Sequence, residues 1–179
     1  EVPPNGDIWV FDSELALALA RSVLAKGGYS SEAALEAYRG WLASEPFDCG
    51  PTVRAALSGR PDAQSQANGS LRRASPLGIL AHAQTPQVAS RWARLDAALT
   101  HPHPVCGDAT AAYVVALAHA VREGDGPQAA FNAAFEWART EAVGPVRAAL
   151  ARARDMPPSS EGQSAGWVLV ALQNAFYEL

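Results

Sequence analysis

The chain has little of what marks several common protein classes. Only two cysteines occur among its 179 residues, Cys49 and Cys106, and their wide separation gives neither a disulfide framework nor the paired spacing of a zinc site. Two reduced thiols suit a cytoplasmic protein. No run of about eighteen apolar residues occurs, so we predict no membrane span, and no signal peptide is evident.

The chain also has no large excess of one charge over the other. The 14 Lys and Arg residues are balanced by 18 Asp and Glu residues, which gives a net charge of −4, and no basic run is present. This balance argues against nucleic acid as the main partner. With 49% hydrophobic and 18% charged residues, the composition is that of a globular protein. We predict a single domain over residues 1–179, and we expect a monomer.

Strand signals are nearly absent, because no stretch sustains an alternation of apolar and polar residues. Apolar residues recur instead at helical spacing along almost the whole chain, and the many alanines favour helix. We therefore predict an all-α fold, a compact bundle of about eight or nine helices. The apolar residues that mark these helices lie within 15–23, 35–42, 52–57, 71–83, 88–99, 113–121, 127–137, 146–153 and 167–176.

Several details of these helices are specific enough to test. Residues 71–83 predict one uninterrupted helix, and Thr85-Pro86 is expected to begin the next one. The predicted apolar stripes are Val88, Trp92, Leu95 and Leu99 on that helix and Trp167, Ala171, Leu172 and Phe176 on the last one. We expect the apolar side chains of Trp167 and Phe176 to be left exposed.

The turn Asn68-Gly69-Ser70 combines an amide, a hydroxyl and unhindered backbone N–H groups where a helix is about to begin. A helix start carries unpaired N–H donors and the positive end of the helix dipole, which suits a phosphate or a carboxylate. Arg72 and Arg73 follow one turn later, with charge to hold such an anion. The same residues are also ordinary turn and capping residues, so a purely structural role stays open.

Two acidic loops admit a structural role and a functional one. Asp12 and Ser13 are expected to cap the first helix, although oxygen ligands at a helix start can also hold Mg²⁺. Asp48 is expected to cap the helix after it, or to contact a ligand hydroxyl. Cys49, its neighbour, is interpreted as a small buried hydrophobe rather than a nucleophile.

His101 and His103 flank a proline, with Cys106 close by, which suggests a zinc site at first sight. The prolines at positions 102 and 104 hold the segment extended and point the two imidazoles in opposite directions. We therefore interpret each histidine as a structural or hydrogen-bonding residue.

Polar loops and one helix occur in a fixed order along nearly the whole chain. They are Trp9 with Asp12-Ser13-Glu14-Leu15, Pro46-Phe47-Asp48 with Gly50-Pro51-Thr52, Gln66-Ala67-Asn68-Gly69-Ser70-Leu71-Arg72-Arg73 with Pro76-Leu77, Thr100-His101-Pro102-His103-Pro104 with Asp108, and Ser164-Ala165-Gly166-Trp167. In this combination the chain resembles the ADP-ribosylglycohydrolase family, the relatives of the dinitrogenase-reductase-activating glycohydrolase.

The resemblance implies an all-α fold with a cleft that holds two Mg²⁺ ions. It also implies a hydrolase that cleaves the glycosidic bond between ADP-ribose and a protein side chain, with ADP-ribose or an ADP-ribosylated protein as partner. The positions that it assigns to ligands are Asp12 and Ser13 for the metal, and Asn68, Gly69, Ser70, His101, Asp48 and Gly50 for the substrate. The family's catalytic acid falls outside this chain, so no catalytic residue is assigned.

The chain departs from the family pattern at the metal loop. Val10 and Phe11 stand where the family carries Thr and the first Asp, and neither side chain can bind a hard cation. Arg72 stands where the family carries Met. The chain begins with Glu1 and ends at Leu179, before the family's second metal motif, so we expect the central part of such a domain.

Three functions remain open from the sequence. The first is an ADP-ribosyl-protein hydrolase of which this chain is a part, and the second is a degenerate module that binds ADP-ribose without hydrolysing it. The third is a purely structural helical protein in which the polar loops are caps.

Overall fold

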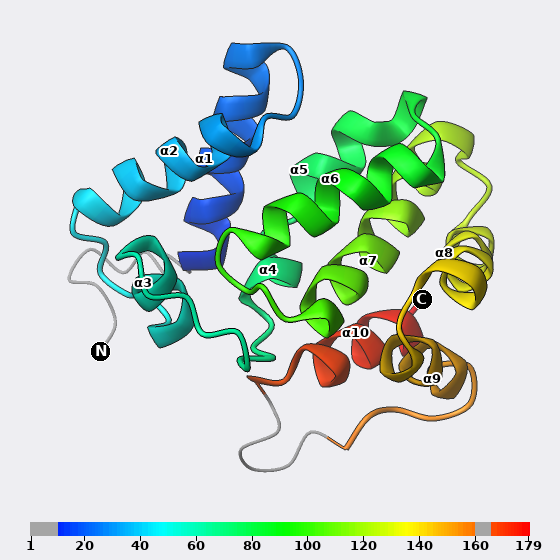
Figure 1. Ribbon diagram of the computed structural model, residues 1–179. Helices are drawn as coiled ribbons and strands as arrows, with labels where there is room; N and C mark the ends of the chain where they lie inside the picture. Colours follow the sequence, from blue (N-terminus) through cyan, green and yellow to red (C-terminus); the bar gives the residue numbers. More distant parts are fainter. Residues whose placement is uncertain (1–10, 160–165) are drawn as a thin grey trace.

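The computed structural model describes residues 11–159 and 166–179, and they form a bundle of helices (Figure 1). Within these ranges the one β-type pairing is an isolated antiparallel bridge between Ala67 and Trp167, so the predicted all-α fold is confirmed. The helices are α1 (Phe11–Lys26), α2 (Ser31–Ala43), α3 (Pro51–Leu57), α4 (Gly69–Arg72), α5 (Ser75–Leu80), the 3₁₀ turn η1 (Ala81–Ala83), α6 (Pro86–Ala98), α7 (Pro104–Glu123), α8 (Pro127–Glu141), α9 (Gly144–Arg152) and α10 (Val168–Tyr177).

Helix α7 lies at the centre of the bundle, with α5 and α6 along one side and α8 along another, while α1 and α2 form a separate pair at one end (Figure 1). Among the described helices it alone is long and apolar enough to cross a membrane, with a mean hydropathy of 1.3. In this fold 61% of that apolar window is buried inside the protein. A central position in a helical core accounts for this composition, and the absence of a membrane span stays a prediction.

Helix α6 buries a different face from the one predicted. Leu95 of the expected stripe is 42% exposed, and Trp92 is only half-buried. The residues buried along this helix are Ala89, Ser90, Ala93, Asp96 and Ala97. The prediction was wrong because small alanines let α6 pack closely on α7, and because a buried carboxylate occupies the same face.

The helix predicted over residues 71–83 is divided into α4, α5 and η1. Pro76 has no backbone N–H with which to bond the carbonyl of Arg72, so the helix cannot continue through this point. The predicted start of α6 is confirmed, since the Thr85 hydroxyl accepts from the backbone N–H of Val88 and Pro86 takes the first helical position. The division at residues 73 and 74 leaves α4 as a single short turn between α1 and α7.

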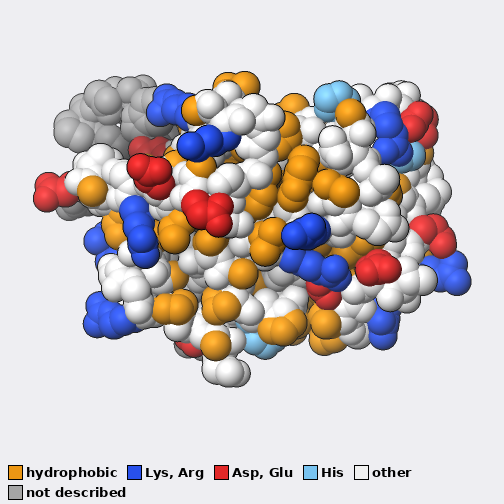
Figure 2. Space-filling view, turned by 45° about the horizontal axis from the view of Figure 1, so that its top comes forward, with side chains coloured by type: hydrophobic (Ala, Val, Ile, Leu, Met, Phe, Trp, Pro, Cys, Tyr) orange, Lys and Arg blue, Asp and Glu red, His pale blue; other side chains and the backbone are white. Residues whose placement is uncertain are grey.

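The exposure predicted for the last helix is confirmed at one residue and wrong at the other. Trp167 is 42% exposed, although it lies just before α10 rather than within it. Phe176 is buried, because its ring packs edge-on against Phe131 of α8 at a centroid distance of 5.7 Å. The face of the molecule drawn in Figure 2 carries acidic and basic side chains intermingled, with apolar side chains between them.

Candidate functional site

The chain just before α4 is held by pairing with the start of α10. The backbone N–H of Asn68 donates to the carbonyl of Gly166 at 3.1 Å, and that of Val168 donates to the carbonyl of Gln66 at 2.8 Å. The indole N–H of Trp167 also donates to the side-chain oxygen of Gln66, at 2.9 Å. The backbone N–H of Asn68 is therefore used within the protein and is not available to a ligand.

Gly69 and His101 come from separate loops, and the structure places them in contact. A Cβ atom added at Gly69 would lie 3.1 Å from His101 Cε1 and 3.3 Å from Nε2, which is tighter than ordinary van der Waals contact. Any side chain at position 69 would push the imidazole away. The sequence assigned both residues to one ligand, and the fold brings them together.

Ser70, the third residue of the turn, faces the protein interior. Its side chain is fully buried, and the Thr110 hydroxyl of α7 lies 3.2 Å from its Oγ. Thr110 Oγ1 also lies 2.8 Å from the carbonyl of Cys106, one helical turn earlier. Ser70 thus fixes α4 against α7, and its hydroxyl is not available to a ligand.

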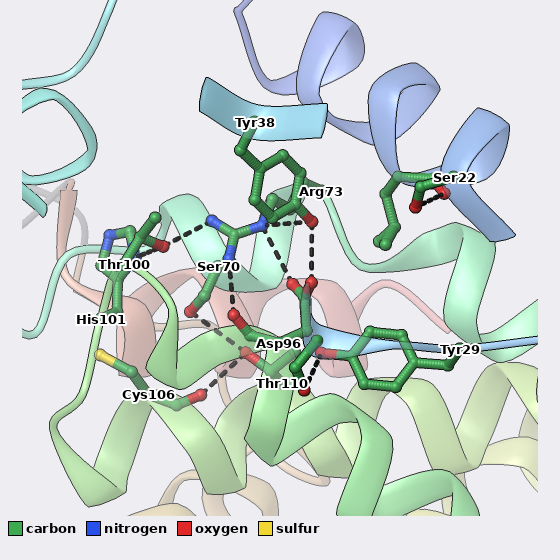
Figure 3. Close-up of polar contacts among 12 residues, drawn as sticks. Ser22, Tyr29, Tyr38, Ser70, Arg73, Asp96, Thr100, His101, Cys106 and Thr110 are labelled. Atoms are coloured by element: carbon green, nitrogen blue, oxygen red, sulfur yellow. Dashed lines mark hydrogen bonds and ion pairs between the residues drawn. The ribbon is translucent and has the colours of Figure 1, made fainter. Parts of the chain in front are cut away.

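Arg73 is fully buried, so the expectation that its charge holds an anion is wrong. Its Nε–H lies 3.0 Å from both the Tyr38 hydroxyl and Asp96 Oδ2, and its Nη2 donates to the Asp96 carbonyl at 2.8 Å. The Tyr38 hydroxyl donates to Asp96 Oδ1 at 2.8 Å, and Nη1 donates to Thr100 Oγ1 at 2.7 Å. Figure 3 shows the guanidinium between Tyr38, Asp96 and Thr100. We call these four residues the Arg73 network.

The Arg73 network sets the tautomer of His101, and burial keeps the ring neutral. Thr100 Oγ1 accepts from Arg73, so its own proton is free to point at His101 Nδ1, which lies 2.8 Å away. Nδ1 is then the acceptor and the ring proton sits on Nε2, the nitrogen that faces Gly69. Burial, aided by the positive charge of Arg73, lowers the pKa of His101 to about 3. The imidazole is therefore a neutral hydrogen-bond donor at physiological pH.

Asp12 lies inside the first turn of α1, because the helix already includes Phe11, and so it is not the capping residue that we predicted. The residue is only 4% exposed. Arg72 Nη2 lies 2.8 Å from Asp12 Oδ2 in an ion pair, while neither carboxylate oxygen accepts a well-aligned hydrogen bond from the described residues. Burial raises the pKa of Asp12, although the charges of Arg72 and Arg73 act in the opposite direction.

The other candidate metal and loop residues lie near Asp12. Ser13 is exposed in the same turn and, like Asp12, it is inside the helix rather than capping it. Asp48 is also exposed; it does not cap α3, whose N-cap is Gly50 with no side-chain hydrogen bond, but its charge acts on Asp12. A Cβ at Gly50 would lie 3.3 Å from the Phe11 ring, so glycine makes room for that phenyl group.

His103 and the cysteines have structural positions. His103 Nδ1 accepts from the backbone N–H of Val105 at 3.2 Å and caps α7, as a hydrogen-bonding role predicts. Cys106 is buried, and burial raises the pKa of its thiol to about 12. Cys49 is half-buried and its pKa is also raised by burial. Within the described ranges, no three His, Cys, Asp or Glu side chains come together as a metal site.

Sequence reasoning missed Tyr38, Asp96 and Thr100 as members of this cluster. Each lies in or beside a helix whose periodicity accounts for it without a functional role. The signal that could have found them is Asp96, an acidic residue four positions before Thr100 on a helix face otherwise made of alanines and one serine. Trp9, Val10, Ser164 and Ala165, which contribute to the family comparison, lie outside the described residues.

The fold and the cluster around α4 define an all-α protein with a short loop-to-helix turn packed on a buried histidine. A family model described as ADP-ribosylglycohydrolase matches residues 3–179, so the chain belongs to the ADP-ribosylglycohydrolase family. It is 32% identical over 129 residues to the ADP-ribosyl-[dinitrogen reductase] glycohydrolase of Rhodospirillum rubrum, and the alignment covers 66% of this chain and 42% of that protein.

A solved structure named ADP-ribosylglycohydrolase-related protein complex has the same fold, with a TM-score of 0.77 at 22% sequence identity. The match covers 95% of this chain and 58% of that one. The chain therefore spans less than two thirds of the length of both relatives. At this identity the structural likeness shows the fold alone, while the family assignment comes from the sequence.

Proposed function

We propose that the chain supplies the ADP-ribose-recognising part of an enzyme that hydrolyses the glycosidic bond between ADP-ribose and a protein side chain. The observation that carries this proposal is the contact between Gly69 and His101. The missing side chain at Gly69 makes room for the imidazole at the start of α4, and the neutral Nε2–H of that ring can donate to a phosphate or ribose oxygen. The relative from Rhodospirillum rubrum, named for hydrolysis of an ADP-ribosyl group, supports the reaction class.

The described residues support a role in ligand binding rather than in bond cleavage. His101 is neutral and buried, so it suits hydrogen-bond donation and cannot act as an acid near pH 7. The chain's part in the reaction is to hold the ligand in a fixed orientation. The two free cysteines and the family membership lead us to propose that this takes place in the cytoplasm, in a monomer.

The Mg²⁺ that the family resemblance implies would bind at Asp12 and Ser13. A buried carboxylate that accepts no well-aligned hydrogen bond from the described residues is suited to a cation. Yet Phe11 offers no oxygen, Ser13 is exposed, and the positive charge of Arg72 already lies 2.8 Å from the carboxylate. The described residues therefore do not fit a bound divalent cation.

The alternative function is an ADP-ribose-binding module without activity. Phe11 and Arg72 favour it, because at the metal loop Phe11 offers no oxygen and Arg72 places a positive charge beside Asp12. Calorimetry with ADP-ribose, with and without MgCl₂, and release of ADP-ribose from an ADP-ribosylated protein distinguish the two functions. Release is measured with the full-length protein, because the catalytic acid that the resemblance implies falls outside this chain. Binding with release then supports the hydrolase, and binding without release supports the module. Absence of binding rejects both and leaves the structural role.

The matched variants are His101→Gln and, as control, His82→Gln, an exposed histidine on η1. We expect His101→Gln to weaken ADP-ribose binding about tenfold or more, as for loss of one buried hydrogen bond to a charged group, and His82→Gln to leave it unchanged. Equal affinities in the two variants would contradict a ligand contact at His101. Circular dichroism and melting temperature show that both variants are folded.

A further inference from the structure

Arg72 and Asp12 form an ion pair in unequal surroundings. The Arg72 side chain is 45% exposed, while the Asp12 side chain is 6% exposed, and the distance between Nη2 and Oδ2 is 2.8 Å. The carboxylate is thus held inside the protein, and the guanidinium reaches it from the surface. Such a carboxylate needs a positive partner, because burial alone disfavours its charge.

The charges around Asp12 identify that partner. Arg72 and Arg73 both favour the ionised carboxylate, and Asp48 opposes it. Arg73, however, is committed to Tyr38, Asp96 and Thr100, so its charge reaches Asp12 only at longer range. Arg72 is therefore the direct counter-charge of Asp12.

We propose that the Arg72 guanidinium takes the place of a divalent cation at Asp12, so that in this chain Asp12 is an ion-pair residue and not a metal ligand. This inference rests on the proposed function, because the family resemblance is what assigns Asp12 to a metal. A guanidinium this close repels a divalent cation and occupies the face of the carboxylate that the cation would use. The adjacent Phe11 side chain, packed against Gly50, adds no oxygen to replace it.

The consequence is that divalent cations do not stabilise this protein through Asp12. The test compares the full chain with Arg72→Met, Asp12→Asn, the double variant and Arg72→Lys, with Arg91→Met at an exposed position of α6 as control. Melting temperatures are measured with EDTA and with millimolar MnCl₂. ADP-ribose affinity is measured on the same samples.

We expect the wild type to melt at the same temperature with EDTA and with MnCl₂. Arg72→Met should melt about 2–4 °C lower than Arg91→Met and should recover with MnCl₂, because Asp12 then accepts the metal ion. The double variant should show no response to MnCl₂, and Arg72→Lys should behave as the wild type. If Arg72→Met fails to fold, Arg72→Lys still decides the test. A role that depends on the positive charge requires Arg72→Lys to be as stable as the wild type.

Three results would overturn the proposal. They are an MnCl₂-dependent rise in the wild type that Asp12→Asn abolishes, an Arg72→Met variant as stable as Arg91→Met, and an Arg72→Met variant that MnCl₂ does not stabilise. ADP-ribose binding by the wild type in EDTA is a separate readout. If the chain binds ADP-ribose but one of these three results is found, the proposed function stands and only the role of Arg72 fails.

Discussion

Arg72 and Arg73 are neighbours in the sequence, yet they belong to two different regions of the molecule. Arg73 is fully buried and bonds Tyr38, Asp96 and Thr100, whereas Arg72 is half-exposed and forms an ion pair with Asp12. Helix α4 ends between them, so their side chains leave the backbone in different directions. Two adjacent arginines with the same charge thus have different roles: Arg73 stabilises the core, and Arg72 forms an ion pair at the candidate site.

The two regions differ in how far their ion pairs are exposed to solvent. Removing one partner of a buried ion pair destabilises a protein by about 3–5 kcal/mol, because the other charge is left without compensation. A pair open to water contributes about 0–1 kcal/mol, because water and salt screen it. Arg73 is of the first kind, and Arg72 lies between the two kinds because only its carboxylate partner is buried.

The largest expected effect is that of Arg73→Met, which breaks the buried side of the comparison. Asp96 would be left in the core without its guanidinium, and the Tyr38 and Thr100 hydroxyls would each lose a contact. We expect a loss of about 3–5 kcal/mol in the free energy of unfolding, measured by urea denaturation against Arg91→Met. A loss below about 1 kcal/mol would show that the network is not a stabilising unit.

The next effect concerns the other end of α4. Gly69→Ala places a methyl group 3.1 Å from His101 Cε1, so the imidazole must move. We expect a loss of about 1–3 kcal/mol in stability together with weaker ADP-ribose binding. Gly28→Ala is the matched control, since a Cβ there meets open space. Wild-type affinity in Gly69→Ala would separate this contact from ligand recognition.

His101 sharpens the comparison through its response to pH. Its pKa is lowered from 6.5 in the unfolded chain to about 3 in the folded one, so the unfolded state binds the proton more readily. The contribution of His101 to stability is complete above pH 6.5 and decreases as the pH falls towards 3, by up to about 1.4 kcal/mol per pH unit. Between pH 7 and pH 4, the free energy of unfolding measured by urea denaturation should therefore fall more steeply for the wild type than for His101→Asn. Parallel curves would contradict the lowered pKa.

The smallest expected effect is that of salt, which separates the two arginines directly. Raising NaCl from about 0.1 M to 1 M shortens the Debye length from about 10 Å to 3 Å and screens the half-exposed pair of Arg72 and Asp12. The stability difference between wild type and Arg72→Met should shrink by a few tenths of a kcal/mol, while that for Arg73→Met should not change. An equal response of both differences would mean that the two pairs share one environment.

Much of the fold could be predicted from residue order. Helical periodicity, alanine content and proline positions predicted the all-α class, and the cap at Thr85 was confirmed. The family resemblance also assigned Gly69 and His101 to one ligand, and the structure places them in contact. These features are local or carried by family pattern, so the sequence contains them without reference to packing.

The failures have a common physical cause. Arg73 was expected to hold an anion and Asp96 was given no role, because a pattern of apolar spacing treats every charge as solvent-exposed. Two opposite charges that neutralise each other in the interior violate that pattern, and only the packed structure brings them together. The apolar stripe predicted for α6 was wrong for the same reason.

By itself the sequence determined the all-α class, the start of α6, the order of the motifs and the family. The tertiary structure alone decided which of two adjacent arginines is buried, which nitrogen of His101 carries the proton, and which charge neutralises Asp12. Helix formation depends on neighbours along the chain, whereas the partner of a charge depends on which groups share its small volume of low dielectric.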